Sequence, residues 1–170
     1  MAQSSAQKAY QQMLAAKNQS SAQAWGNASG IIGKTIQTTL KAAEKEVSHR
    51  TYRAANELRN SALYVLRGSR GGRTYRIPNT GATYKASVPG QPPAVRTGAF
   101  RLSWGTHVHV EKSGVHFRAV AAIESGERAG GYLLGELLEN GTSKMAPRPY
   151  KEKIKAKAMP KIRQIYAAPF

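Results

Sequence analysis

The strongest constraint on the fold is a long helical pattern between Ile31 and Leu66. Its apolar residues recur mostly at steps of three, four or seven, and this spacing places them on one face of an α-helix. They are Ile32, Ile36, Leu40, Ala43, Val47, Ala54, Leu58, Ala62 and Val65. Arg67 and Gly68 follow as a stop signal, because a cation and then a glycine favour the end of a helix.

The length of this helix raises a question. At about 1.5 Å per residue it would be roughly 50 Å long, which is more than a compact domain of this size needs. Two explanations stay open at this point. Either the helix breaks near Ser48–Thr51, or another subunit covers part of its apolar stripe.

Residues 1–30 form an arm that is rich in alanine, glutamine and serine. Alanine and glutamine favour helix, so we expect a weak helix over Ala6–Lys17 and a flexible joint at Gly26–Gly30. The start of the chain, Met1–Ser5, lacks the basic and apolar regions of an export signal. We interpret the arm as a loosely packed extension, with a partner-binding arm as the alternative.

Residues 67–98 are expected to form a basic loop, with six glycines, four prolines and no acid. Thr74–Ile77 and Ala82–Lys85 can each form a short strand within it. The segment Pro89–Pro93 is expected to be irregular, because proline lacks a backbone donor and restricts its predecessor.

The second half of the chain alternates helix and strand signals. Thr97 can cap a short helix over Gly98–Ser103. Trp104–Glu111 and Val115–Ile123 predict a hairpin that turns at Ser113-Gly114 and pairs Val110 with Phe117 and Val108 with Ala119. Two further helices are expected, over Tyr132–Asn140 and Tyr150–Tyr166, with Gly141 ending the first and Pro160 kinking or splitting the second.

These elements predict an α+β fold. A small antiparallel sheet is packed by the long helix of the first half and by a basic C-terminal helix. The domain boundaries that we expect are 1–30 for the arm and 31–170 for the main domain, with the basic loop at 67–98.

The composition argues against an enzyme and against a membrane protein. There is no cysteine and no aspartate, so thiol nucleophiles and most carboxylate pairs are excluded. No Gly-x-Ser-x-Gly turn occurs, and no apolar run approaches the roughly 18 residues of a membrane span. We therefore expect no catalysis, no cofactor and no membrane contact.

Two short motifs resemble parts of ligand-binding sites, but the residues around them do not complete either site. Gly33-Lys34-Thr35 resembles the end of a phosphate-binding loop, yet the loop's first glycine is missing. His107 and His109 alternate on a predicted strand, where Arg118 would lie opposite His109 and no carboxylate would join the pair. We interpret the histidines as solvated strand residues.

Charge is the clearest remaining signal. The chain carries 26 basic and 9 acidic residues, a formal charge of +17. Residues 141–170 alone carry eight basic side chains and one acid. Such a surface can be a solvated face, or it can bind nucleic acid or an acidic protein. A basic, sequence-nonspecific nucleic-acid-binding protein is therefore one hypothesis.

Two stretches resemble a known family. Tyr84–Ser103 contains Ser87-x-Pro89-Gly90-x-Pro92-Pro93 and then Thr97-Gly98-x-Phe100-Arg101-x-Ser103. Leu138–Tyr150 contains Glu139-x-Gly141-Thr142 and then Lys144-Met145-Ala146-x-Arg148-Pro149-Tyr150. Both are similar to the head–tail joining, or tail-completion, family of long-tailed bacteriophages. The resemblance covers about 31–166, and the arm lies outside it.

The resemblance implies a structural virion protein that catalyses nothing. Its members form a ring in the phage neck, so we expect a ring, as a hexamer, that joins the head connector to the end of the tail tube. The expected partners are other copies of the chain, the head connector or stopper, and the tail terminator or tail tube proteins. Genomic DNA would only pass through the lumen. The protein would reside in the virion neck, and in the host cytoplasm during assembly.

The resemblance also implies which residues meet a neighbouring subunit or partner. These are Pro92, Pro93, Arg96, Thr97, Gly98, Arg101, Glu139, Gly141, Arg148 and Tyr150. We expect Arg101 to point outward, and Arg96 and Arg101 to meet acidic groups of the neighbour. The cationic residues from Lys151 to Arg163 are expected to face a partner ring or solvent.

Overall fold

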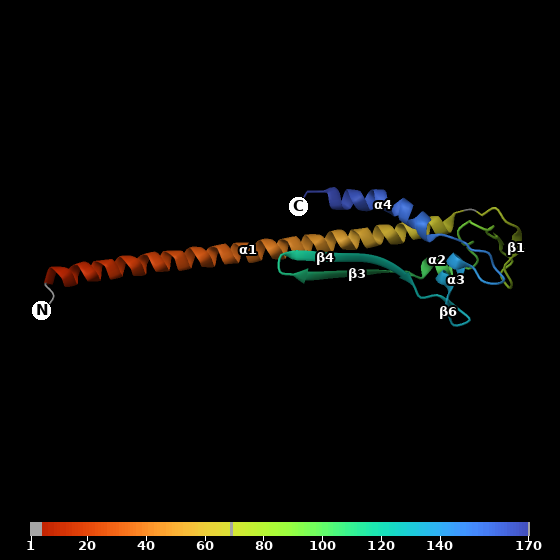
Figure 1. Cartoon of the computed structure of the whole chain (residues 1–170). Helices are drawn as coiled ribbons and strands as arrows, with labels where there is room; N and C mark the ends of the chain where they lie inside the picture. Colours follow the sequence, from red (N-terminus) through yellow and green to blue (C-terminus); the bar gives the residue numbers. More distant parts are fainter. Residues whose placement is uncertain (1–4, 69, 170) are drawn as a thin grey trace. The chain divides into compact units, whose positions relative to one another are not determined.

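The computed structural model describes residues 5–68 and 70–169 and has the expected α+β fold (Figure 1). The start of the arm, residues 1–4, lies outside the described residues, and so do Ser69 and Phe170. The chain divides into two compact units, Met1–Glu44 (unit 1) and Lys45–Phe170 (unit 2).

The first helix, α1, runs from Ser5 to Arg67 and belongs to both units. It ends where the sequence predicted, but the expected joint at Gly26–Gly30 is wrong. Of the two explanations left open for its length, a break near Ser48–Thr51 is excluded. A glycine costs only about 1 kcal/mol in a helix, and helix-forming alanines and glutamines surround this cluster. The Thr51 hydroxyl donates to the Val47 carbonyl one turn earlier, at 2.7 Å, so this residue is satisfied inside the helix.

In unit 2 the last helix, α4 (Lys151–Ala167), lies antiparallel alongside α1. Three contacts occur in opposite order along the two helices: Lys157 with Tyr64, Lys161 with Glu57, and Tyr166 with Thr51. Helix α4 continues through Pro160, so the expected split is wrong. Both Pro160 and Ala156 are exposed, so water can reach the Ala156 carbonyl that the proline cannot bond.

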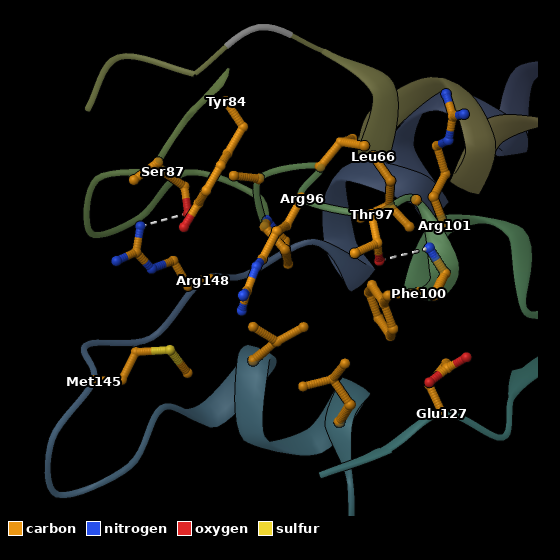
Figure 2. A pocket seen from close by; sticks show the side chains of 18 residues that line it. Leu66, Tyr84, Ser87, Arg96, Thr97, Phe100, Arg101, Glu127, Met145 and Arg148 are labelled. Carbon is orange, nitrogen blue, oxygen red and sulfur yellow. Dashed lines mark hydrogen bonds between the residues drawn. The ribbon is translucent and has the colours of Figure 1, made fainter. Parts of the chain in front are cut away.

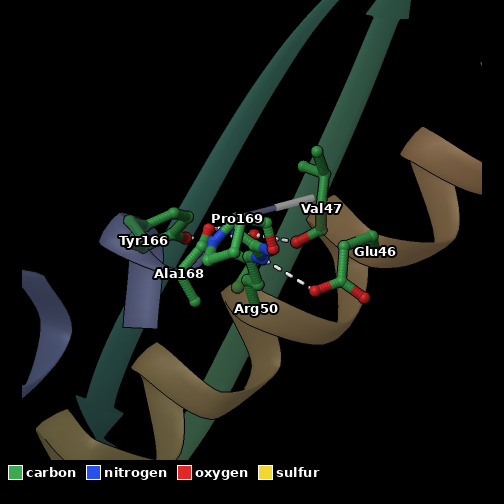
Figure 3. Close-up of polar contacts among 7 residues, drawn as sticks. Glu46, Val47, Arg50, Tyr166, Ala168 and Pro169 are labelled. Carbon is green, nitrogen blue, oxygen red and sulfur yellow. Dashed lines mark hydrogen bonds and ion pairs between the residues drawn. The ribbon is translucent and has the colours of Figure 1, made fainter. Parts of the chain in front are cut away.

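Arg50 ties the end of the chain to α1 (Figure 3). Its side chain is 2% exposed and donates to the carbonyls of Ala168 and Pro169, both at 2.6 Å. Its Nε donates to Glu46 at 2.7 Å, and this hydrogen bond lowers the pKa of the Glu46 carboxyl. One buried guanidinium therefore fixes the C-terminal end of α4.

The core of unit 2 forms around three aromatic rings. Phe100, Trp104 and Tyr150 meet edge to face, with centroids 5.6, 5.7 and 5.9 Å apart. Such edge-to-face contacts suit the charge distribution of aromatic rings. Ala62 and Leu66 of α1 and Ile154 of α4 complete the buried cluster.

The strands form three separate two-stranded antiparallel sheets. Strands β1 (Thr74–Arg76) and β2 (Thr83–Lys85) confirm the two short strands of the basic loop. Strands β3 (Trp104–Ser113) and β4 (His116–Ser125) form the predicted hairpin. A third pair, β5 (Arg128–Ala129) and β6 (Tyr132–Leu133), was not predicted.

The register of the β3–β4 hairpin differs from the prediction by two residues. Val110 pairs with Ala119, and the loop consists of Gly114 and Val115. Gly114 has a φ of 59°, and a glycine with positive φ at the first loop position is typical of a type II′ turn. The prediction placed this glycine second. Because the shift is even, the apolar residues still share a face.

Two short helices lie close to the predicted positions. Helix α2 (Ala99–Leu102) begins after Gly98, and the Thr97 hydroxyl accepts a hydrogen bond from the Ala99 amide at 3.3 Å. Helix α3 (Leu134–Asn140) ends at Gly141 as expected. Its predicted first two residues belong to β6 instead.

The buried Tyr150 makes stability depend on pH. Burial, with Glu139 and Glu136 nearby, raises the pKa of Tyr150 to about 12. In the unfolded chain its ordinary value is about 10. The stabilisation that Tyr150 provides is thus complete below about pH 10 and is lost as pH rises towards about 12.

We expect the difference in unfolding free energy between wild type and Tyr150→Phe to shrink across this window, as measured by urea denaturation at a series of pH values. The exposed Tyr10→Phe is the control, and a difference that stays constant with pH would contradict the expectation.

Candidate functional site

Unit 2 contains a pocket of about 530 Å³ where the two resemblance stretches meet (Figure 2). The first stretch supplies one wall, from Tyr84 to Arg101. The second supplies Leu138, Met145 and Arg148. Segments that are about 40 residues apart in the sequence thus line one cavity, and the resemblance did not predict a pocket between them.

The pocket combines an apolar floor with cations. Phe100, Leu134, Leu138 and Met145 supply the apolar part of the lining. Figure 2 shows the Arg96 guanidinium pointing into the pocket, and no other described residue forms a hydrogen bond or ion pair with it.

The other charged groups of the lining are placed differently. The Arg148 guanidinium donates to the hydroxyl of Ser87. Glu127 is the one acidic residue among the described residues that line the pocket. In Figure 2, Arg96 and Glu127 lie on either side of Phe100. The side of the pocket near Arg96 therefore favours an anion.

Arg70 holds the proline segment against the end of α1. Its guanidinium donates twice to the Pro93 carbonyl, at 2.9 and 3.0 Å. It also donates to the carbonyls of Val65 and Gly68, at 3.0 and 2.6 Å, which lie where α1 ends. Arg70 is buried, and burial lowers its pKa. This role of Arg70 was not predicted from the sequence, although an arginine shortly after a helix end can satisfy the last carbonyls of that helix.

Several predicted interface residues instead hold unit 2 together. Pro92, Pro93 and Gly98 are buried, and Tyr150 is 1% exposed. The Tyr150 hydroxyl donates to the carbonyl of Gly135 at 3.0 Å. These side chains are covered by their own unit.

Glu139 and Gly141 also have internal roles. The Glu139 carboxylate accepts from the amides of Tyr150 and Lys151, at 2.9 and 3.2 Å, and so caps the start of α4. Gly141 has a φ of 78°, and a Cβ there would lie 2.7 Å from the Met145 carbonyl oxygen. Only glycine fits this turn.

The remaining predicted residues divide between surface and interior. Arg96 and Thr97 are exposed, and Arg148 is half-buried. Arg101 is half-buried too, and its Nε is buried without a hydrogen-bond partner among the described residues. Arg101, which was expected to point outward, is therefore only partly exposed.

The corrected hairpin register changes the surroundings of the two histidines. The Nε2 atom of His109 lies 3.0 Å from a carboxylate oxygen of Glu111, and the Nε2 atom of His107 lies 3.6 Å from one of Glu124. The expectation that no carboxylate joins the two histidines is therefore wrong. Arg118 pairs with Glu111, not with His109. In the part of the chain that the structure describes, no group of three or more histidine, cysteine or acidic residues could hold a metal.

The Gly33-Lys34-Thr35 motif lies inside α1. The Thr35 hydroxyl donates to the carbonyl of Ile31, one turn earlier, at 3.0 Å. A phosphate-binding loop needs consecutive backbone amides that are free to bind the phosphate, and a continuous helix does not offer them.

Three lysines of α4 are engaged within unit 2. Lys153 donates to the Gly90 carbonyl at 2.9 Å, Lys157 lies 3.8 Å above the Tyr64 ring, and Lys161 lies 3.2 Å from Glu57. These three side chains thus contact unit 2 while they remain exposed to solvent. Part of the basic C-terminal stretch therefore serves packing between α4 and its neighbours.

Unit 1 presents an apolar face on α1, here called the unit 1 face. Seven large side chains make it up, all of them exposed: Tyr10, Met13, Leu14, Trp25, Ile31, Ile32 and Ile36. At about 3.6 residues per turn, they fall on one side of the helix in two groups, 10–14 and 25–36, and Lys17 and Ser21 lie on the same side between the groups. Gly26, Gly30 and Gly33 lie about half a turn away, on the polar side. The sequence placed Ile32 and Ile36 on one apolar stripe, but the extension of that face into the arm was not predicted.

Comparison of the chain with protein families, with curated proteins and with solved structures finds no match. None of the described helices is both long enough and apolar enough to cross a membrane.

Proposed function

We propose that this chain is a structural protein of a bacteriophage neck. Copies of it form a ring, expected as a hexamer, that joins the head connector or stopper to the tail terminator or the end of the tail tube. The protein catalyses nothing and needs no cofactor. Its place is the virion neck, after assembly in the host cytoplasm, and DNA passes through the ring.

The observation that carries this proposal is the unit 1 face. An apolar face of seven large side chains on one helix is unusual on a surface that stays in water. Their exposed fractions run from 39% for Leu14 to 77% for Trp25, so the face holds apolar surface that a stable interface would remove from water. An assembly of several copies covers such a face, as the long helix already suggested.

The proposal that this assembly is a phage neck ring comes from the resemblance of the stretches Tyr84–Ser103 and Leu138–Tyr150 to the head–tail joining family. Tyr150, Glu139 and Gly141 of the second stretch have internal roles, since they build the turn and the start of α4. The exposed Arg96 stays available to a neighbour. These residues support a shared fold with the joining proteins of long-tailed phages.

The alternative is a basic protein that binds nucleic acid without sequence preference. The charge of +17 favours it, but Lys153, Lys157 and Lys161 already contact unit 2. We expect DNA binding by the free protein to be weak and to disappear at moderate salt, because few phosphates are neutralised. Tight binding at about 0.2 M salt in an anisotropy titration would favour the alternative.

Complementation of particle assembly tests the proposal. Cells infected with a phage that lacks this gene should accumulate filled heads and finished tails that do not join. Addition of the purified protein to that extract should restore infectious particles. Joining that proceeds equally well without the protein would overturn the proposal.

A further inference from the structure

We propose that the unit 2 pocket is a peptide-binding site for a different protein of the neck, and that it recognises a carboxylate side chain next to a large apolar one. This inference rests on the proposed function for the identity of the partner. The chemistry of the site rests on the pocket alone.

The apolar lining sets one half of the specificity. Phe100, Leu134, Leu138 and Met145 line a cavity of about 530 Å³, which is large enough for a bulky side chain. Methionine adapts its shape to a guest, because its side chain is flexible and polarisable. An apolar side chain that enters this cavity exchanges part of its contact with water for contact with these side chains.

Arg96 accounts for the preference of the pocket for a carboxylate. It is a cation that no described group pairs with, and Figure 2 shows it directed into the pocket. A guanidinium binds a carboxylate with two parallel hydrogen bonds, which are stronger than those between neutral groups. Arg148, which belongs to the second stretch, adds positive charge to the lining, while Glu127 stands apart from Arg96. An acidic residue of the guest therefore belongs beside Arg96.

The occupant is another protein because this chain has no suitable acidic segment. Its acids are nine glutamates, and all except Glu127 lie in described helices or strands. Glu127 itself lines the pocket. A glutamate in a helix cannot enter a cavity as an extended peptide, and the strand residues Glu111 and Glu124 already lie against His109 and His107. The described glutamates of a second copy therefore offer no matching free segment.

The test uses three blocked tetrapeptides, Ala-Glu-Phe-Ala, Ala-Gln-Phe-Ala and Ala-Lys-Phe-Ala. They are titrated into the full-length protein carrying ¹³C-methyl methionine. Met145 lines the pocket, whereas Met13 and Met159 lie in α1 and α4. We expect the glutamate peptide to shift the Met145 methyl signal and to bind about tenfold more tightly than the glutamine peptide, as one charge-assisted contact implies.

Substitution of Arg96 tests whether this residue causes the preference for the glutamate peptide. Arg96→Gln should remove the preference for glutamate, and Arg96→Glu should transfer it to the lysine peptide. Arg163→Gln, an exposed charge on α4, is the matched control and should change nothing. Because Arg96 is exposed, both variants should fold normally.

Two results would overturn the inference. One is equal binding of the glutamate and glutamine peptides to the wild-type protein. The other is a glutamate preference that survives Arg96→Glu, since the attraction would then come from the overall charge of +17. Neither result bears on head–tail joining, which the complementation experiment tests separately.

Discussion

Replacement of Arg70 by alanine is expected to lower the unfolding free energy of unit 2 by about 3 kcal/mol. The substitution leaves several carbonyls without their donor, and each unsatisfied buried group costs about 1–3 kcal/mol. These carbonyls belong to Pro93, Val65 and Gly68, so both the end of α1 and the proline segment lose support. Urea denaturation followed by Trp104 fluorescence, in a Trp25→Phe background, measures the effect.

The matched control is Arg73→Ala, which removes an exposed arginine of the same basic loop. An exposed charge contributes little, so its effect should stay within about 0.5 kcal/mol. If both variants unfold at the same urea concentration, Arg70 does not hold the proline segment in the way that the hydrogen bonds indicate.

The simultaneous replacement of Trp25, Ile31 and Ile32 by serine is expected to prevent ring assembly while the chain still folds. These side chains are exposed in the separate chain, so folding does not depend on them. In an assembly each buries enough apolar surface to contribute about 1.5 kcal/mol or more. Loss of all three should weaken each subunit contact by about a thousandfold or more. Quantitative mass spectrometry of purified particles measures the incorporated copies.

The matched control substitutes three residues on the polar side of the same helix, Gln19, Gln23 and Gln37, by serine. It introduces the same residue type and leaves the unit 1 face intact. Normal incorporation of the face variant, or equal loss in both variants, would show that this face does not join the subunits.

The sequence predicted those elements whose signals are local. The stripe over 31–66, with Arg67 and Gly68 after it, gave the end of α1 correctly. The glycines at 26–30 were misleading, because a glycine interrupts a helix only where the neighbouring residues do not favour helix strongly enough to offset its cost. The hairpin was predicted, but its register depended on whether Gly114 stood first or second in the loop, and both choices keep the apolar faces together.

The site could not be predicted, because its partners are distant in the sequence. Nothing local connects Arg70 with Pro93, Arg148 with Ser87, or Glu139 with the start of α4. The resemblance marked most of these residues as important and assigned them to an interface. The structure gives several of them internal roles, and it leaves Arg96 and the unit 1 face exposed.

The number and symmetry of copies in the assembled neck test the central claim most directly. Electron cryomicroscopy of purified virions, with the chain identified by its side-chain density, would supply both. We expect one closed ring between head and tail, with six copies and the unit 1 face buried against neighbouring protein. One or two copies per particle, or a ring in which Trp25, Ile31 and Ile32 remain in solvent, would contradict this account.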